Sequence, residues 1–265
     1  MLIIAERINA SRKKIADAIA AADAEFIQKE AKAQDLAGAD YIDVNAGIFV
    51  GDESDKLRWV IQAVQAVTDK PLCIDSPDPA VMGAMLPFVK MTPMINSITL
   101  EPSRLERILP LVVEHKTKVI ALCQAEHETA ETAEAKVALA GRIIEKLTEA
   151  GVPLDDIYID PLVYPLSTNP QSARATLDAI GLIMKTFPGA HTICGLTNVS
   201  YGLPARKLIN RAFLAAAITM GLDSAIIDPT DTLLYAMLKA ATLIVGKDDF
   251  CMDYIGAFRE GRVGI

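Results

Sequence analysis

The amino-acid sequence predicts an α/β protein that folds as a single (β/α)8 TIM barrel. Eight short apolar runs recur along the chain, and longer stretches with helical spacing separate them. This alternation implies a parallel sheet, because parallel neighbours need a crossover connection between them. Eight repeats within 265 residues favour a closed barrel over an open sheet or two small domains. No Pro/Gly/Ser-rich linker interrupts the chain, so we expect one domain over residues 1–265.

Each element follows from a short pattern in the sequence. The segments between the apolar runs have amphipathic spacing, as in KLRWVIQAVQAV from Lys56, RLERILPLVVEH from Arg104 and AKVALAGRIIEKLTEAG from Ala135. The last of these ends at Gly151, a residue type typical of helix C-termini. The predicted strands, in chain order, are LIIA from Leu2, YIDVN from Tyr41, LCIDS from Leu72, MINS from Met94, KVIALC from Lys118, IYID from Ile157, TICGL from Thr192 and SAIID from Ser224.

Composition excludes several classes of protein. A net charge of -8 argues against nucleic acid as a partner, because proteins that bind polyanions carry clustered Lys and Arg. No run approaches the roughly 18 to 20 apolar residues of a membrane span. The N-terminal MLIIAERIN places Glu6 and Arg7 where a signal peptide would be apolar. We therefore expect a cytoplasmic protein with no membrane partner.

Cofactor chemistry held by the chain itself is also disfavoured. Cys73, Cys123, Cys194 and Cys251 form no CxxC pair, so we expect small buried apolar residues rather than a zinc or redox site. The three histidines, His115, His127 and His191, lie away from the strand ends, so no metal site is predicted. Glycine-rich phosphate loops are missing after the last two strands. The lysines Lys90, Lys116 and Lys118 are not placed for a Schiff base.

Polar residues gather instead at the carboxyl ends of the predicted strands. In barrels of this kind these ends converge on one mouth, where the chemistry takes place. Some of these residues, such as Ser76 or Asp78, could equally be helix N-caps, but capping does not require carboxylates and amides at nearly every strand end. The residues concerned are Glu6, Asn9, Asp43, Asn45, Asp75, Asn96, Asp160, Asn198 and Asp228.

Such a mouth suits a neutral heterocycle that presents adjacent N–H donors on one edge. A pterin ring does this, because its N3–H and 2-amino group form a fork that an ionised Asp accepts with two hydrogen bonds. Asn side chains can serve the ring carbonyl and the remaining nitrogens. The amide of Asn198, on a short turn after TICGL, can donate or accept and is our candidate catalytic group.

Seven motifs, in matching order along the chain, resemble one known family. They are ERIN, DVNAG, DSPDP, MINS, IDPL, GLTNVS and LINRAF. The chain resembles the pterin-binding methyltransferases that work with corrinoid proteins. These include the acetogen-type methyltetrahydrofolate:corrinoid enzymes, the desulfitobacterial type of the glycine-betaine pathway, and the folate domain of cobalamin-dependent methionine synthase. This resemblance implies a pterin-binding (β/α)8 barrel, usually assembled as a homodimer.

The resemblance also assigns roles to individual residues. It implies that Asp75, Asn96 and Asp160 hold the pterin and that Asn198 hydrogen-bonds N5, the atom that gives or takes the methyl group. It places further contacts at Gly195, Tyr201 and Arg206, although Tyr201 departs from the Gln that acetogen-type enzymes carry after NVS. A second layer of site residues is expected at Glu6, Asn9, Asp43, Asn45 and Asp228.

The expected reaction moves a methyl group between a protein-bound corrinoid and N5 of tetrahydrofolate, with tetrahydrofolate favoured as the acceptor. Tetrahydrofolate and 5-methyltetrahydrofolate are then substrates, no metal is bound, and cobalamin arrives on a partner protein, because the chain lacks an Asp-x-His-x-x-Gly loop. The alternative is methyl transfer from methyltetrahydrofolate to the corrinoid iron-sulfur protein of acetyl-CoA synthesis. Remoter alternatives are a dihydropteroate synthase-like enzyme, disfavoured because NAGIFVGDE lacks that enzyme's Ser-Thr-Arg loop, and a pterin-binding module without turnover.

Overall fold

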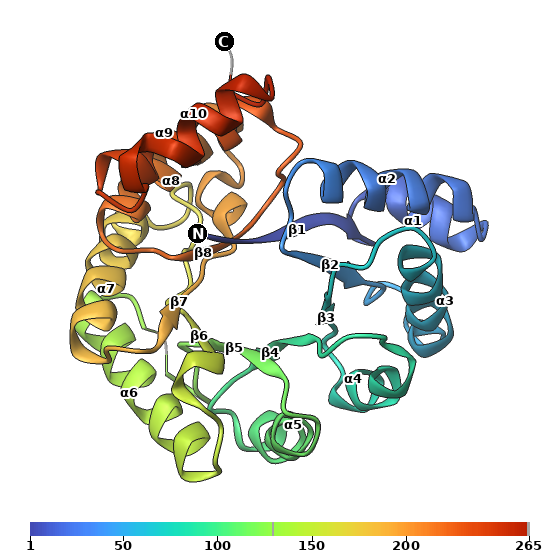
Figure 1. The fold of residues 1–265 in the computed structure, drawn as a ribbon. Coiled ribbons are helices and arrows are strands. Elements are labelled where there is room, and N and C mark those ends of the chain that lie inside the picture. The colour runs from blue at the N-terminus through green and yellow to red at the C-terminus, as the bar shows by residue number, and fades with distance from the viewer. Residues whose placement is uncertain (129, 264–265) are drawn as a thin grey trace.

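The computed structural model describes residues 1–128 and 130–263 and confirms the predicted barrel (Figure 1). All eight predicted strands form one parallel sheet in the order β7-β6-β5-β4-β3-β2-β1-β8. The ring closes just after β7, where Ile226 N donates to Cys194 O at 3.0 Å. The strands are β1 (Leu2–Asn9), β2 (Tyr41–Asn45), β3 (Leu72–Asp75), β4 (Met94–Ile98), β5 (Lys118–Leu122), β6 (Ile157–Asp160), β7 (His191–Thr192) and β8 (Ser224–Ile227).

Helices surround the sheet (Figure 1). Side-chain caps begin several of them, including Asp23, Asp78 and Thr132, each of which accepts a backbone N–H of the first turn. Gly151 follows the end of α6 with φ +91, as its position in the sequence predicts. The helices are α1 (Lys13–Ala20), α2 (Ala24–Leu36), α3 (Glu53–Gln65), α4 (Pro79–Met85), α5 (Pro102–His115), α6 (Ala133–Glu149), α7 (Ser172–Thr186), α8 (Arg206–Thr219), α9 (Thr232–Ile244) and α10 (Met252–Arg259), with 3-10 turns η1 (Leu86–Phe88), η2 (Leu154–Asp156), η3 (Leu196–Ser200) and η4 (Asp249–Cys251).

A layer of side chains fills the inside of the barrel. Ile4, Cys73, Met94, Ile120 and Tyr158 are buried together there, one from each of five strands. Because successive side chains of a strand point to opposite faces, the residue two positions further along each strand also faces the barrel axis. This packed layer therefore closes the barrel from below and forms the base on which the polar residues of the mouth rest.

Three details differ from the sequence-based expectations. Strand β7 is only two residues long, and beyond it the backbone meets β8 at a single isolated bridge between Gly195 and Ile226. Cys251 is exposed, whereas the other three cysteines are buried as expected. His191 begins β7 and stacks on Tyr158 with ring centroids 4.7 Å apart.

Among the described residues, no helix combines the length and the apolar character needed to cross a membrane.

Candidate active site

The carboxyl ends of the strands form a polar floor immediately above the apolar interior. Glu6 follows Ile4, Asp75 follows Cys73, Asn96 follows Met94 and Asp160 follows Tyr158 at the two-residue spacing that keeps them on the inner face. Asp43 and Asp228 follow Tyr41 and Ile226 at the same spacing, and Asp43 pairs in register with Cys73 of the packed layer. The sequence therefore predicted the convergence of these side chains correctly.

Two adjoining cavities occupy the mouth above this floor, with volumes of about 590 and 580 Å³. Asn9, Ser11, Asp75 and Asn96 line both. Each cavity is of the size that small-molecule ligands fill. The first is lined from the predicted set by Glu6, Asn9, Asp43, Asp75, Asn96, Gly195, Asn198, Arg206 and Asp228, and the second includes Asn45. Asp160 and Tyr201 lie outside both linings.

Asn198 lies in η3 at the edge of the first cavity, and its side chain is exposed. Its backbone N–H donates to Gly195 O at 3.3 Å, and its backbone oxygen accepts from Tyr201 N at 3.1 Å. Within the described part of the chain, its side-chain amide forms no hydrogen bond, so it does not cap the turn. The backbone positions the amide, and the amide itself is available to a ligand.

Gly195 leaves the space in which this amide lies. A Cβ atom added at residue 195 would lie 3.2 Å from Nδ2 of Asn198. That separation is closer than most Cβ contacts, so any side chain at this position would displace the amide. Gly195 also lines the cavity, which agrees with its predicted place in the site.

Asp75 is the carboxylate best placed for a ligand fork. It ends β3, lines both cavities, and has Asn9 Nδ2 3.5 Å from its Oδ2 atom. Burial raises the pKa of Asp75 to about 6, Glu53 adds to the rise, and Asn45 and Arg104 oppose it. Asp75 is therefore mainly ionised at neutral pH and can accept two N–H groups.

Asp43 is more deeply buried than Asp75. It is 2% exposed, and Asn96 Nδ2 lies 3.5 Å from its Oδ1 atom. Burial, reinforced by the charge of Asp75, raises the pKa of Asp43 well above its ordinary value. Asp43 therefore retains its proton at pH values where an exposed aspartate has lost it, and it orients Asn96 from below.

Asp160 is covered by its own loop, which explains its absence from the cavity lining. It is 6% exposed, and Leu162 N donates to its Oδ1 atom at 2.7 Å. Burial raises the pKa of Asp160 to about 6, whereas the N–H groups of Leu162 and Gly195 and the ammonium of Lys136 oppose the rise. Its predicted contact with a pterin therefore requires a ligand that enters deeply.

Lys136 is a site-supporting residue that the sequence analysis missed. It lies in α6, is 1% exposed, and donates to Pro161 O and Leu162 O, each at 2.6 Å. Its nitrogen also lies 5.0 Å from the ring centroid of Tyr164. A signal was present, because Lys136 shares the helical stripe of Leu139, Ala140 and Ile143, which are buried.

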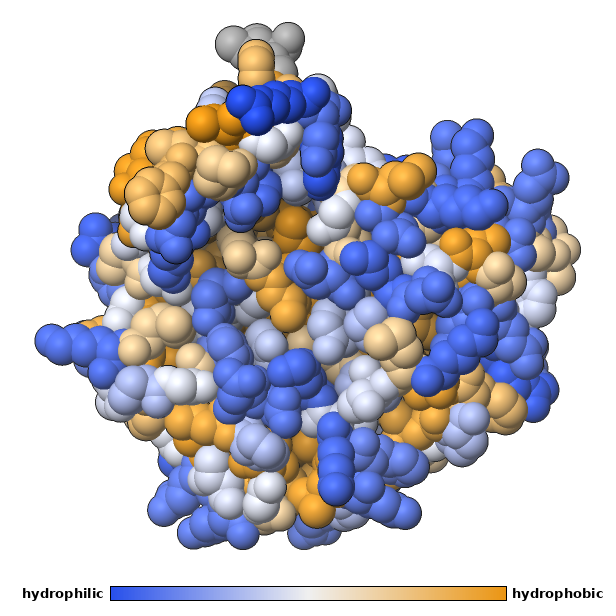
Figure 2. Space-filling view, viewed as in Figure 1, coloured by the Kyte–Doolittle hydropathy of each residue, from blue (hydrophilic) through white to orange (hydrophobic). Residues whose placement is uncertain are grey.

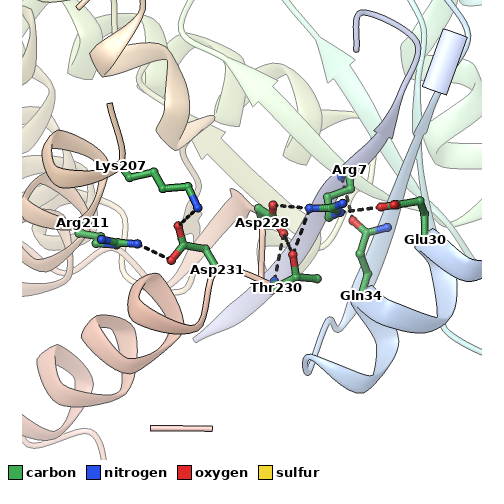
Figure 3. Close-up of polar contacts among 8 residues, drawn as sticks. All are labelled: Arg7, Glu30, Gln34, Lys207, Arg211, Asp228, Thr230 and Asp231. Atoms are coloured by element: carbon green, nitrogen blue, oxygen red, sulfur yellow. Dashed lines mark hydrogen bonds and ion pairs between the residues drawn. The ribbon is translucent and has the colours of Figure 1, made fainter. Parts of the chain in front are cut away.

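An ion-pair network fixes the end of β8 (Figure 3). Arg7 joins Glu30 of α2 to Asp228, with Nε to Oε2 at 2.6 Å and Nη1 to Oδ2 at 2.9 Å. Thr230 donates its hydroxyl to the other oxygen of Asp228 at 2.6 Å. Asp228 is thus held in a fixed orientation at the cavity wall.

Cationic side chains also lie at the rim of the mouth. Arg12, Arg206 and Lys207 all line the first cavity. Arg206 holds η3 in place, since its Nη2 donates to Thr197 O at 2.7 Å. Its guanidinium lies 5.8 Å from the ring centroid of Tyr201, which is 66% exposed. Arg206 therefore supports the turn that carries Asn198, and Tyr201 packs outside that turn.

A second anchored carboxylate lies beside this rim. Asp231 caps α9 and pairs with Lys207 at 3.1 Å and Arg211 at 2.7 Å (Figure 3). In the second cavity, Arg104 donates to the backbone oxygens of Ser76, Pro77 and Ser97. These cations stabilise loops at the strand ends, a role that sequence position alone did not indicate.

The described residues contain no cluster of His, Cys, Asp and Glu suited to a metal ion.

The fold and the mouth can now be compared with known proteins. Residues 5–228 match the family model of pterin binding enzymes. The chain belongs to the pterin-binding enzyme family. It is also 36% identical over 266 residues to the methylcorrinoid:tetrahydrofolate methyltransferase of Eubacterium limosum, which covers 100% of this chain and 98% of that protein. The predicted family resemblance is confirmed.

More distant relatives share parts of this pattern. The methionine synthase of Mycobacterium tuberculosis is 32% identical over 246 residues, which cover 88% of this chain but 21% of that protein. The dihydropteroate synthase of Coxiella burnetii in complex with pteroic acid superposes with a TM-score of 0.71, 18% identity, and coverage of 92% and 93%. The Xanthomonas albilineans dihydropteroate synthase gives 0.67 and 16%, with 92% of each chain covered. At these identities the synthase structures establish the shared fold alone.

Proposed function

We propose that this protein is a methyltransferase that moves a methyl group between a protein-bound corrinoid and N5 of tetrahydrofolate, with tetrahydrofolate as the acceptor. The observation that carries the proposal is the exposed amide of Asn198, which lies above a floor of carboxyl groups and forms no hydrogen bond with any residue that the structure describes. The full-length similarity to the methylcorrinoid:tetrahydrofolate methyltransferase of Eubacterium limosum supports the reaction class.

In this proposal the floor of the mouth holds the pterin ring. Asp75 accepts the N3–H and 2-amino fork, Asn96 serves the adjacent ring atoms, and Asp160 meets the far end of the ring beneath the loop of Leu162. The pKa of about 6 for both carboxyl groups leaves them ionised at neutral pH. An ionised carboxylate forms stronger hydrogen bonds to N–H groups than a neutral one does.

The transfer step is a displacement at the methyl carbon. The N5 lone pair attacks the methyl group, the carbon–cobalt bond breaks, and its electron pair stays on the cobalt. The N5–H proton then leaves. Asn198 can accept N5–H through its oxygen or donate to N5 through its nitrogen, so one side chain serves folate before and after methylation.

The corrinoid belongs to a partner protein in this scheme. Its docking site is the open mouth, since the methyl group must reach N5 from outside. We expect the isolated chain to purify colourless and to need a separate corrinoid protein for fast turnover. A purified chain with a stoichiometric corrinoid absorption spectrum would contradict this division of labour.

The function is tested by incubating the purified chain with tetrahydrofolate and free methylcobalamin, then with a methylated corrinoid protein. We expect 5-methyltetrahydrofolate to form as the methylcobalamin absorption disappears. Transfer only from methyltetrahydrofolate to a corrinoid iron-sulfur protein would favour the alternative of acetyl-CoA synthesis. Folate binding without transfer in either direction would identify a binding module, and condensation of a dihydropterin diphosphate with 4-aminobenzoate would identify a dihydropteroate synthase-like enzyme.

Asp75→Ala is expected to weaken tetrahydrofolate binding. The ligand would keep two buried N–H donors without an acceptor, which costs about 1.5 to 3 kcal/mol, or about 10- to 150-fold in affinity. In the wild type, affinity should fall as the pH drops through about 6, where Asp75 gains a proton. Calorimetric titration measures both effects. Asp55→Ala, an exposed carboxylate paired with Arg58, is the control, and equal affinity of the two folded variants would exclude the role of Asp75.

A homodimer is also proposed, with its contact on α9 and α10. In α8, Phe213, Leu214 and Ile218 are buried inside the protein, whereas Leu208 is exposed. Apolar side chains gather over α9 and α10 (Figure 2), where Ile244, Phe250 and Phe258 are 78%, 93% and 63% exposed. Light scattering at low micromolar concentration should give about twice 28.5 kDa. A mass near 28.5 kDa would contradict the dimer.

A further inference from the structure

The proposed reaction moves a proton as well as a methyl group. When the methyl group arrives, N5 changes from a secondary to a tertiary amine, and the N5–H proton must be taken up. In the opposite direction N5 must gain a proton when its methyl group leaves. The amide of Asn198 can hydrogen-bond to N5, but it cannot hold this proton at neutral pH. A second side chain with an accessible ionisation is therefore required, or else water must serve.

Most acidic groups of the first cavity are engaged elsewhere. Asp228 is fixed by Arg7 and Thr230, and Asp231 by Lys207 and Arg211. Asp43 lies beneath Asn96 and is 2% exposed. Asp75 faces the pterin fork in the proposed binding mode. Among the described residues that line this cavity, only Glu6 has a carboxyl group with no ion pair, no place in the pterin fork and no bond to a side chain that holds the pterin.

Glu6 has the position that the proton requires. It follows the interior residue Ile4 on β1, so its side chain rises from the barrel floor into the cavity that Asn198 also lines. Its Oε2 atom lies 3.4 Å from the hydroxyl of Thr197, the residue that precedes Asn198 in η3. The carboxyl group and the amide thus line one cavity, the first from β1 and the second from η3.

We propose that Glu6 is the acid–base residue of the transfer, and this inference rests on the proposed function. When tetrahydrofolate receives the methyl group, the new carbon–nitrogen bond uses the N5 lone pair and the Glu6 carboxylate takes the N5–H proton. In the reverse direction the Glu6 carboxylic acid returns that proton to N5 as the carbon–nitrogen bond breaks. Solvent exchanges the proton with Glu6 between turnovers.

The charges around Glu6 adjust its acidity for this task. Burial raises the pKa of Glu6 to about 7, Asp228 adds to the rise, and Arg12, Thr197 and Arg206 oppose it. Asp43 lies on the neighbouring strand β2, and the charge of Glu6 contributes to the rise in the pKa of Asp43. A group whose pKa lies near the working pH can accept and release a proton with equal ease.

Glu6→Gln tests the proposal, because glutamine keeps the size of the side chain and its hydrogen bond to Thr197 but cannot take up a proton. The wild type should gain rate through about pH 7 with tetrahydrofolate as acceptor and lose rate through the same pH in the reverse direction. In Glu6→Gln the change of rate near pH 7 should disappear in both directions, and the rate should fall by about 10² to 10⁴. Tetrahydrofolate affinity should stay within about threefold, because in this scheme Glu6 does not hold the pterin.

Glu53→Gln is the matched control. Glu53 is a buried carboxylate near Asp75 that accepts the hydroxyl of Ser76 at 2.5 Å and does not line either cavity. The Glu53→Gln variant should keep the change of rate near pH 7 that the wild type shows. If Glu6→Gln keeps its rate within twofold of wild type, or keeps the same pH profile, the proton passes to water and the proposal is wrong. The wild-type assay shows whether methyl transfer takes place at all. A failure of the proposed function is therefore distinguished from a failure of the role proposed for Glu6.

Discussion

Asn198→Ala is expected to lower the turnover number about 10² to 10³-fold, the effect typical of removing one preorganised hydrogen-bonding group. Because the amide forms no internal hydrogen bond among the described residues, its removal should not unfold η3. The backbone bonds from Asn198 N to Gly195 O and from Tyr201 N to Asn198 O remain. The dissociation constant for tetrahydrofolate should change far less than the turnover number.

Two further variants separate assistance from scaffolding. Asn198→Asp keeps an acceptor for N5–H but loses the donor, so it should impair transfer from methyltetrahydrofolate more than transfer to tetrahydrofolate. Asn169→Ala is the control, because Asn169 accepts Gln171 N at 3.0 Å and serves only its own turn. Stopped-flow measurement of methylcorrinoid absorbance gives the rates. A turnover number within twofold of wild type for Asn198→Ala would show that the amide is scaffolding.

The fold could be predicted because each strand of a closed parallel barrel is a short apolar run, and each crossover needs a helix. The floor of the mouth followed from the same pattern, since the two-residue period that buries Ile4 and Cys73 also directs Glu6 and Asp75 upward. Strand β1 departs from this period. A bulge between Ala5 and Ile8 lets both Glu6 and Asn9 reach the cavity. The residues of ERIN do not predict this bulge.

The electrostatic division of the site could not be predicted. Asp43 and Asp75 look alike in DVNAG and DSPDP, yet burial and the charge of Asp75 raise the pKa of Asp43 well above its ordinary value, whereas the pKa of Asp75 rises to about 6. That difference depends on depth of burial and on neighbours from other strands. Glu6 was predicted only in the second layer of the site, because its contact with η3 joins residues from opposite ends of the chain and depends on closure of the barrel.

Lys136→Met is expected to destabilise the protein and to weaken folate binding together. The ammonium of Lys136 satisfies Pro161 O and Leu162 O in a buried site, and methionine would leave both oxygens without a donor. The loss of a buried charged donor should lower the free energy of unfolding by about 3 kcal/mol. Urea denaturation measures this change. Lys146→Met, on the exposed face of the same helix and paired with Glu149, should alter it by less than about 0.5 kcal/mol.

The folate effect follows from the charge that Lys136 holds near Asp160. Lys136 opposes the rise in the pKa of Asp160, which is about 6 in its presence, so its removal should raise that pKa further. A larger fraction of Asp160 would then be protonated at pH 7 and unable to accept two N–H groups. Tetrahydrofolate affinity measured against pH should therefore decline at a higher pH in Lys136→Met than in wild type. If the folded variant shows the wild-type pH midpoint, Lys136 supports only the loop, and the ionisation of Asp160 is set by burial and its backbone N–H donors.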